Sequence, residues 1–335
     1  MIIKVDSYFS GWLSIIKKGE VVFEKAYGFA DIANQRPNTI HTRFATASAG
    51  KTFVAVAILK LIQQDKLALS DTIGKMLAID WKQIDPDITI EQLLKHTSGI
   101  PDYFNENEMD DYEALWKDFP NYKIRTSSDL IPLFIDKPMM YPKNERFQYN
   151  NTGYVVLGLI LEAIMDKPLD HVLSEIIFEP CNMHDTGYFE LDRLPVDCAN
   201  HYIWDKENNQ YRTNIYSVDA KGSGAGGAFT SLKDIGLFWN HLLQGKIISM
   251  HMVKQMLSIQ VFDQGDDPYG YGVWLRKCDD RLCPYMTGMD PGVSFISLMD
   301  QHHDVMITIA SNLGQDVWSL MSKVIQAIKQ VEMIG

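Results

Sequence analysis

A serine and a lysine three residues apart are the first residues in the chain whose types and spacing could do chemistry. Ser48 and Lys51 stand where a long apolar segment begins. If Ser48 opens a helix, positions i and i+3 lie on the same face of its first turn, so the Lys51 amine can reach the serine hydroxyl. A buried amine with a lowered pKa can take the serine proton and create a nucleophile. The pair therefore predicts an acyl-serine site.

The same spacing occurs a second time, at Ser14 and Lys17. That pair lies in a segment rich in β-branched residues, which predicts a strand, and in a strand positions i and i+3 point to opposite faces. Residues 48–65 instead predict a buried helix, because apolar residues cover most of its circumference. A plainer interpretation stays open, in which Ser48 is only the N-cap of a core helix.

Two tyrosine–asparagine pairs are further candidates. They are Tyr103 with Asn105 and Tyr149 with Asn151. A tyrosine near a lysine can share a proton relay, and an asparagine amide can hold a substrate carbonyl. Taken singly, each tyrosine is more often a structural residue, so these pairs gain weight only from their neighbourhood.

The elements that must position these residues follow from periodicity and turn signals. Strands are predicted over residues 12–16, 21–27, 272–275, 293–298 and 305–310, and helices over 48–65, 90–101, 151–165, 232–243 and 317–331. Strands at both ends with helices between them predict an α+β fold, in which an antiparallel sheet from both termini is flanked by helices and carries an inserted, mainly helical lobe. The sheet lobe is assigned to residues 1–47 and 215–335, and the helical lobe to 48–214; together they form one catalytic unit.

Three segments are not assigned to these strands and helices. The glycine-rich residues 222–228 lack the spacing and the lysine of a phosphate-binding loop, so they predict close backbone packing. Residues 105–118 are acidic and predict a surface excursion, and residues 190–220 have no clear periodicity.

The composition restricts the partners. The chain has 335 residues and a net charge of −12, which argues against nucleic acid or an anionic membrane as a partner because no basic surplus exists. No apolar run reaches ~18 residues, so no membrane span is predicted. The first residues do not read as a signal peptide; the chain as written predicts a cytoplasmic protein, or an extracytoplasmic one if a leader was removed.

The four cysteines have no zinc-site spacing, and the sequence predicts neither a metal site nor a cofactor. Free thiols are expected in a chain of this length. Cys278 and Cys283 flank a short acidic turn and could face each other across a hairpin, which leaves a disulfide between them open.

The order of the pieces along the chain resembles the class C β-lactamase family, with its related D,D-peptidases, D-amino-acid amidases and esterases. The resemblance runs from about residue 11 to about residue 328. It depends on six pieces in the expected order: Ser48-x-x-Lys51, the segments 93–103, 147–154 and 177–186, Gly226-Gly227-Ala228, and Met286-Thr287-Gly288 followed by Met289.

The resemblance implies roles for four of these residues. Ser48 is similar to the family nucleophile, Lys51 to its activating amine and Tyr149 to its general base or proton shuttle. Asn151 matches the side chain that contacts the substrate amide. His96 matches a turn residue of the family, so none of the histidines is needed for the chemistry.

The resemblance also implies an oxyanion hole. It is formed by the backbone N–H groups of Ser48 and Met289, the latter just after Thr287 and Gly288 on the edge strand of the sheet. This sequence differs from the family pattern at Met286, where the family usually has Lys or His to hold a substrate carboxylate. Met286 therefore predicts weaker recognition of anionic β-lactams and favours an esterase, an amidase or an unusual peptidase.

Two functions are left open at this point. One is a serine hydrolase that acts on a small-molecule or peptide substrate through an acyl-serine. The other is a catalytically idle, penicillin-binding-like sensor, which Met286 favours and the intact Ser48, Lys51, Tyr149 and Asn151 set disfavours. The oligomeric state and the physiological substrate are not predicted.

Overall fold

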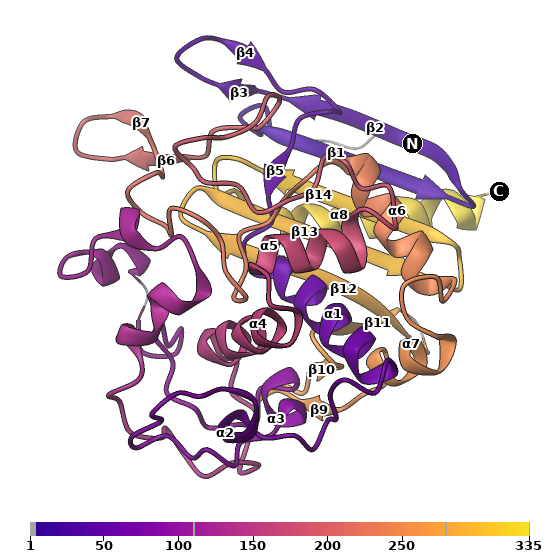
Figure 1. Ribbon diagram of the computed structural model, residues 1–335. Coiled ribbons are helices and arrows are strands. Elements are labelled where there is room, and N and C mark those ends of the chain that lie inside the picture. The colour runs from indigo at the N-terminus through magenta and orange to yellow at the C-terminus, as the bar shows by residue number, and fades with distance from the viewer. Residues whose placement is uncertain (1–4, 110, 279, 335) are drawn as a thin grey trace.

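The computed structural model describes residues 5–109, 111–278 and 280–334 (Figure 1). Its main feature is one antiparallel sheet of eight strands. Across the sheet the strands lie in the order β2 (Glu20–Tyr27), β1 (Gly11–Lys17), β14 (Val305–Ser311), β13 (Val293–Asp300), β12 (Arg281–Asp290), β11 (Trp274–Cys278), β10 (Pro268–Tyr269) and β9 (Val261–Phe262).

The first and last strands of the chain's sheet meet near one edge of it, where only β2 lies outside them. β1 pairs with β2 on one side and with β14 on the other, and Trp12 lies opposite Ala310. The hairpin turn between β1 and β2 uses Lys18 and Gly19, both with positive φ, as the turn signal predicted. The α+β fold with a sheet from both termini is thereby confirmed.

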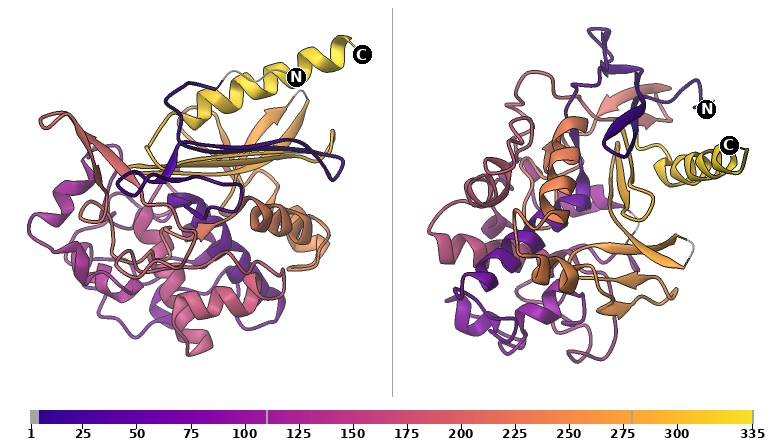
Figure 2. Two further views of the ribbon diagram at one scale, coloured as in Figure 1. Left: turned by 90° about the horizontal axis from the view of Figure 1, so that it is seen from above. Right: turned by 90° about the vertical axis from the view of Figure 1, so that its right-hand side faces the viewer.

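Helices cover both faces of the sheet, but most of them lie on the same face. They are α1 (Lys51–Gln63), α2 (Ile73–Met76), α3 (Ile90–Leu94), α4 (Asn151–Met165), α5 (Leu169–Leu173), α6 (Leu232–Leu243), α7 (Met250–Met256) and α8 (Val317–Ile334). Figure 2 shows α8, in yellow, on one side of the sheet and the other helices on the opposite side. The hydrophobic core is split in the same way: Met321 and Val324 of α8 pack with Ile307, while Phe53 and Phe238 pack in the larger cluster on the other face.

Short elements complete the chain. Short helical segments are η1 (Ala47–Gly50), η2 (Tyr112–Trp116), η3 (Asn121–Lys123), η4 (Ser127–Leu133) and the π-helical η5 (Ser174–Phe178). Three small hairpins or bridges pair β3 (Phe29–Asp31) with β4 (Arg36–Pro37), β5 (Phe44–Ala45) with β8 (Phe229–Thr230), and β6 (Tyr202–Asp205) with β7 (Gln210–Thr213). None of the helices in the described part of the chain is long and apolar enough to span a membrane.

Two predictions about strands need correction. The β6–β7 hairpin lies in residues 190–220, where no periodicity was found, because its strands are only four residues each. β12 is not an edge strand, since it lies between β13 and β11. Its pairing with β11 ends at Tyr285, however, so the segment Met286–Asp290 pairs on one side only, with β13. The assignment of residues to two lobes stays a prediction.

Candidate active site

Ser48 lies in a single 3-10 turn, η1, that directly precedes α1. The predicted helix therefore begins three residues later, at Lys51. Ser48 is not an N-cap, because the N-cap of α1 is Gly50 and no side chain caps it. Ala47, just before the serine, has φ of 46°, a region that non-glycine residues rarely adopt and that costs on the order of 1–3 kcal/mol. Such strain needs firm support from the surrounding backbone.

That support comes from the glycine-rich segment, residues 222–228. The Thr46 N–H donates to the carbonyl of Ala228 at 2.7 Å, and the Gly227 N–H donates to the carbonyl of Ala47 at 3.0 Å. A Cβ on Gly226 would lie 2.4 Å from the Ala47 carbonyl oxygen, so only glycine fits there. The prediction of close backbone packing for residues 222–228 is confirmed, and the packing holds the turn that carries Ser48.

Lys51 is buried beneath Ser48, with 2% of its surface exposed. Its Nζ donates to the Ser48 Oγ at 2.8 Å, to the Asn151 Oδ1 at 2.8 Å and to the carbonyl oxygen of Ala225 at 2.5 Å. Burial lowers the pKa of Lys51 to about 8, although the carboxylates of Glu106 and Asp102 act in the opposite direction. The spacing of three residues thus brings amine and hydroxyl into contact, and the amine loses its proton near neutral pH.

Asn151 is the first residue of α4, a helix with two side-chain anchors at its start. Asn150 is the N-cap and accepts from the Gly153 N–H at 2.7 Å. The Asp102 carboxylate accepts from the N–H groups of Asn151 and Thr152 at 2.9 and 3.0 Å. A negative charge is favourable at a helix N-terminus, so Asp102 holds α4 in a fixed position against Lys51.

The Asn151 side chain itself is fully engaged. Its Oδ1 accepts from Lys51, and its Nδ2 donates to the Phe104 carbonyl at 3.1 Å and to the Glu106 carboxylate at 3.3 Å. A substrate carbonyl can take the place of Glu106, an exposed side chain, without disturbing the contact to Lys51.

Tyr149 lies over the same amine. The Lys51 Nζ is 4.9 Å from the centre of the Tyr149 ring. Burial raises the pKa of Tyr149 well above its usual value, and its hydrogen bond with Ser48 only partly offsets this. The ring is held from behind by His96, whose ring centre lies 4.5 Å away, and the His96 Nδ1 accepts from the Asn150 N–H at 3.1 Å. His96 therefore supports Tyr149 without reaching Ser48.

β12 approaches η1 through Gly288. A Cβ on Gly288 would lie 2.3 Å from the Thr46 carbonyl oxygen and 2.5 Å from the Ser48 nitrogen. Only a residue without a side chain lets the strand backbone come this close to the serine amide. This contact brings the next residue, Met289, to the site, where its side chain is 65% exposed.

Thr287 and Met286 behave differently from Gly288 and Met289. The Thr287 Oγ1 donates to the Phe295 carbonyl at 2.9 Å and accepts from the Trp318 indole at 2.9 Å, so its only proton is used inside the protein. Met286 is 1% exposed and belongs to the large core cluster. Of the predicted site residues on β12, it is the one whose side chain the structure does not bring to the substrate cavity.

The substrate cavity has a volume of about 920 Å³ and is lined by Ser48, Tyr149, Asn151 and the segment Thr287–Asp290. Part of its wall comes from residues 105–118, which were predicted to be a surface excursion. Glu106, Met109 and η2 contribute there. The sequence showed only that this segment is acidic, and nothing in a single sequence shows that such a segment folds back over a distant serine.

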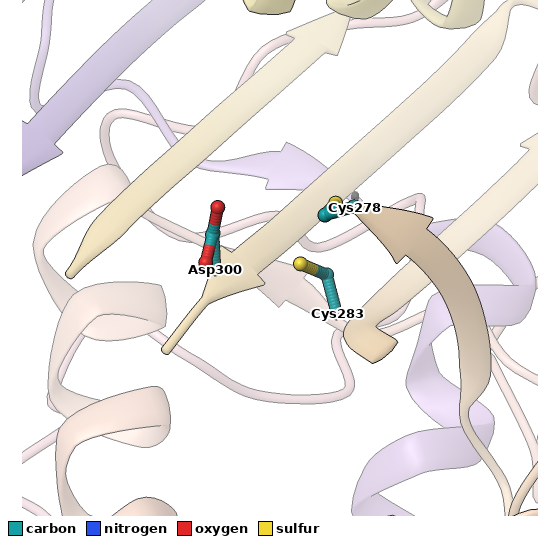
Figure 3. A group of neighbouring side chains, drawn as sticks. All are labelled: Cys278, Cys283 and Asp300. Atoms are coloured by element: carbon teal, nitrogen blue, oxygen red, sulfur yellow. The ribbon is translucent and has the colours of Figure 1, made fainter. Parts of the chain in front are cut away.

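Cys278 and Cys283 lie on the hairpin of β11 and β12, at the far end of β12 from Gly288 (Figure 3). Both are free thiols, so the disulfide is not formed. With Asp300 they form the only group of possible metal ligands among the residues that the structure describes. Asp300 already accepts from the N–H groups of His302 and His303 and contacts the His303 ring at 2.7 Å. Internal hydrogen bonds thus already engage the Asp300 carboxylate.

Comparison with known proteins gives consistent matches over nearly the whole chain. A sequence profile of the family described as Beta-lactamase matches residues 9–323. A crystal structure of a penicillin binding protein from Bacillus halodurans is 34% identical, with a TM-score of 0.91, covering 96% of this chain and 97% of that one. Penicillin-binding protein 4* of Bacillus subtilis is 26% identical over 92% of this chain and 69% of its own length. A teichoic acid D-alanine hydrolase of Staphylococcus aureus is 24% identical, over 83% of this chain and 67% of its own length.

Proposed function

The chain belongs to the beta-lactamase family, and from this premise we propose that it is a serine hydrolase that forms an acyl-enzyme at Ser48. The observation that carries the proposal is the 2.8 Å contact between the Ser48 hydroxyl and a buried Lys51 amine with a pKa of about 8. With this pKa about a tenth of the amine is neutral at pH 7 and about half at pH 8, and the neutral form can accept the serine proton when the hydroxyl attacks a carbonyl.

The two candidate bases have separate roles in this proposal. Lys51 takes the proton, because its pKa is lowered towards neutrality. Tyr149 keeps its own proton, because burial raises its pKa well above the usual range. A neutral phenol can still accept one proton while it donates its own, so Tyr149 serves as a shuttle to the leaving group rather than as the base.

The tetrahedral oxyanion is stabilised by the backbone N–H groups of Ser48 and Met289 in this scheme. Support comes from the contact of Gly288 with the Ser48 amide, which sets two adjacent backbone segments side by side. Removing one preorganised donor of this kind raises the activation free energy by ~3–4 kcal/mol. Neither a metal nor a cofactor is required by this mechanism.

The substrate is an ester or amide rather than a carboxylate-bearing β-lactam. Met286 supplies no cation, and its side chain lies in the core. None of the cavity-lining residues in the described chain is Lys or Arg. A substrate carboxylate would therefore lose hydration without gaining a charged partner.

Turnover of p-nitrophenyl butyrate and acylation by a fluorescent penicillin test the proposal. The wild type is expected to hydrolyse the ester, and Ser48→Ala to lose at least about 10³-fold in kcat/KM, because the nucleophile is gone. Penicillin is expected to acylate more slowly than the ester. A wild-type protein without ester turnover, or equal turnover in Ser48→Ala, would refute the proposal.

A further inference from the structure

Two thiols and a carboxylate converge at the end of the main sheet. Cys278 ends β11, Cys283 lies in β12 and Asp300 ends β13, so three neighbouring strands supply one group each. The two sulfur atoms and a carboxylate oxygen all lie within 4.8 Å of one another, and Figure 3 shows the three side chains facing the same space. None of the three lines the cavity that contains Ser48. This group is therefore separate from the candidate active site.

The strand register brings these groups to one face of the sheet. Continued from Tyr285 towards the hairpin turn, the pairing of β12 with β13 places Cys283 opposite Asp300. Cys278 lies opposite Arg281, two residues before Cys283, so the two cysteines point to the same face. Both cysteines pack in the cluster that α8 covers. The backbone itself thus fixes the convergence.

The Asp300 carboxylate is oriented by the turn that follows β13. One oxygen accepts from the N–H groups of His302 and His303 at 3.0 and 3.1 Å, and the other lies 2.7 Å from Nδ1 of the His303 ring. An ionised carboxylate offers about four lone-pair sites, so these three contacts leave room for one more partner. Carboxylates that bind metal ions are commonly held by such outer hydrogen bonds. Asp300 is therefore already oriented as a metal ligand would be.

The two cysteines are available as ligands. Both are free thiols, and they share a hydrogen bond. Cys283 is buried, whereas Cys278 and Asp300 are half-buried, so water and small ions can reach the group from one side. The other cysteines of the chain, Cys181 and Cys198, belong to no such group among the described residues.

The donor set selects the class of ion. Ca²⁺ and Mg²⁺ take oxygen ligands, so two sulfur donors argue against them. Thiolates bind Zn²⁺ and Cu⁺, and a carboxylate beside them favours Zn²⁺, which accepts sulfur, nitrogen and oxygen ligands. Tetrahedral Zn²⁺, with bonds of ~2.3 Å to sulfur and ~2.1 Å to oxygen, holds its ligand atoms roughly 3.6–3.8 Å apart. Donor atoms that already lie within 4.8 Å of one another reach this geometry by small side-chain movements.

We propose that Cys278, Cys283 and Asp300 form a site for Zn²⁺, with water at the fourth tetrahedral position. The inference goes beyond the proposed acyl transfer and does not depend on it. Each thiol releases one proton to solvent as its sulfur binds the ion, and no electron is transferred. The bound ion joins β11, β12 and β13 beside the hairpin turn, so its role is to stabilise this end of the sheet.

Titration with ZnCl₂ and CoCl₂ tests the site. The protein is first stripped with a chelator and kept in a phosphine reductant, so that the cysteines stay as thiols. Wild type is expected to bind one ion per chain, and its Co²⁺ complex to show thiolate-to-metal charge-transfer absorption in the near ultraviolet. The variants are Cys283→Ser and Asp300→Asn, and the matched control is Cys181→Ser, which removes a buried thiol outside the group.

The affinities distinguish the site from scattered binding. Because even an outer partner of a metal site contributes roughly 10–100-fold in affinity, Cys283→Ser is expected to weaken Zn²⁺ binding about 100-fold or more, and Asp300→Asn about tenfold or more. Cys181→Ser should keep the wild-type affinity. Free Zn²⁺ at about 100 times Kd should raise the wild-type Tm by about 4 °C and leave the Tm of Cys283→Ser unchanged. A single cooperative thermal transition shows that each variant is folded.

Three results would overturn the inference. They are a wild type that retains no ion, an affinity that neither Cys283→Ser nor Asp300→Asn changes, and a Co²⁺ complex without charge-transfer absorption. Loss of binding in Cys283→Ser alone would also count against the site, because it removes the carboxylate from the ligand set. None of these outcomes bears on acylation of Ser48, which p-nitrophenyl butyrate turnover tests separately.

Discussion

The candidate reaction centre depends on Ser48 and Lys51, which are three residues apart, and on burial of Lys51, which lowers the pKa of its amine. The Lys51 amine touches the Ser48 hydroxyl, and its pKa falls to about 8 because the amine is desolvated. Three acidic groups, Glu106, Asp102 and Asp290, limit this fall. Their negative charges favour the protonated amine and so keep its pKa from falling further below 8.

This pKa predicts the pH dependence of acylation. The neutral amine is the active form and accumulates as pH rises, so kcat/KM for an ester is expected to rise about tenfold per pH unit below pH 8 and to level off above it. Stopped-flow acylation measured between pH 5 and 10 checks this. Lys51→Arg should remove the pH-dependent activity, whereas Lys60→Arg, a matched change on the same helix, should preserve the profile. A wild-type rate already constant from pH 5 would contradict the role of Lys51.

At this scale the sequence predicted the pair itself but not its environment. The i, i+3 spacing was enough to place Ser48 against Lys51, and the wrong detail was the helix start, which lies at Lys51. The positions of Asp102 and Asp290 near Lys51 could not be predicted, because a carboxylate in a single sequence carries no sign of what it will face. Met286 was placed on the right strand, but its burial depends on packing across the sheet.

Two elements hold the serine turn in place through glycines that allow close backbone contact. The glycine-rich segment 222–228 packs on one side of η1, and β12 packs on the other through Gly288. The strained φ of Ala47 persists because both neighbours fix the turn. The sequence predicted the close packing of the glycines, but it did not predict that β12 would stop pairing with β11 at Tyr285 and leave a free edge beside Ser48.

Gly288→Ala tests the fit between β12 and η1. The new methyl group would lie 2.3 Å from the Thr46 carbonyl oxygen and 2.5 Å from the Ser48 nitrogen, so strand and turn must move apart. Loss of one oxyanion donor then lowers kcat/KM about 10²–10³-fold. Gly265→Ala is the control, since its nearest atom would be 3.4 Å away, and it should retain wild-type kcat/KM. Full activity of Gly288→Ala would show that this approach is not needed.

For the whole molecule, the main sheet separates two cores. α8 packs on the face away from the helices that carry the site, and its cluster contains Met321 and Val324 (Figure 2). The pattern of strands at both ends predicted a sheet flanked by helices, but not which face of the sheet the terminal helix would cover. The strand order could not be predicted, since contacts between distant segments leave no local signal in the sequence. The β6–β7 hairpin was missed because its strands are only four residues each.

Met321→Ala separates stability from catalysis. Met321 is fully buried on α8, so its truncation is expected to lower the free energy of unfolding by about 2–5 kcal/mol. The folded fraction should keep the wild-type kcat/KM, because Met321 does not line the cavity. Urea denaturation and ester kinetics measure the two quantities, and Gln326→Ala, an exposed change on the same helix, should alter neither. A large loss of kcat/KM at constant fold would contradict the separation of the two faces.

Peptide mapping after reaction with a fluorophosphonate tests the central claim most directly, because it identifies the residue that attacks. The account predicts one adduct per chain, on the peptide that contains Ser48, absent from Ser48→Ala and present in Ser14→Ala. Ser14 is the fitting control, since it belongs to the second serine–lysine pair of the same spacing but lies buried in β1. An unlabelled wild type, or a label that persists in Ser48→Ala, would contradict the assignment of Ser48 as the nucleophile.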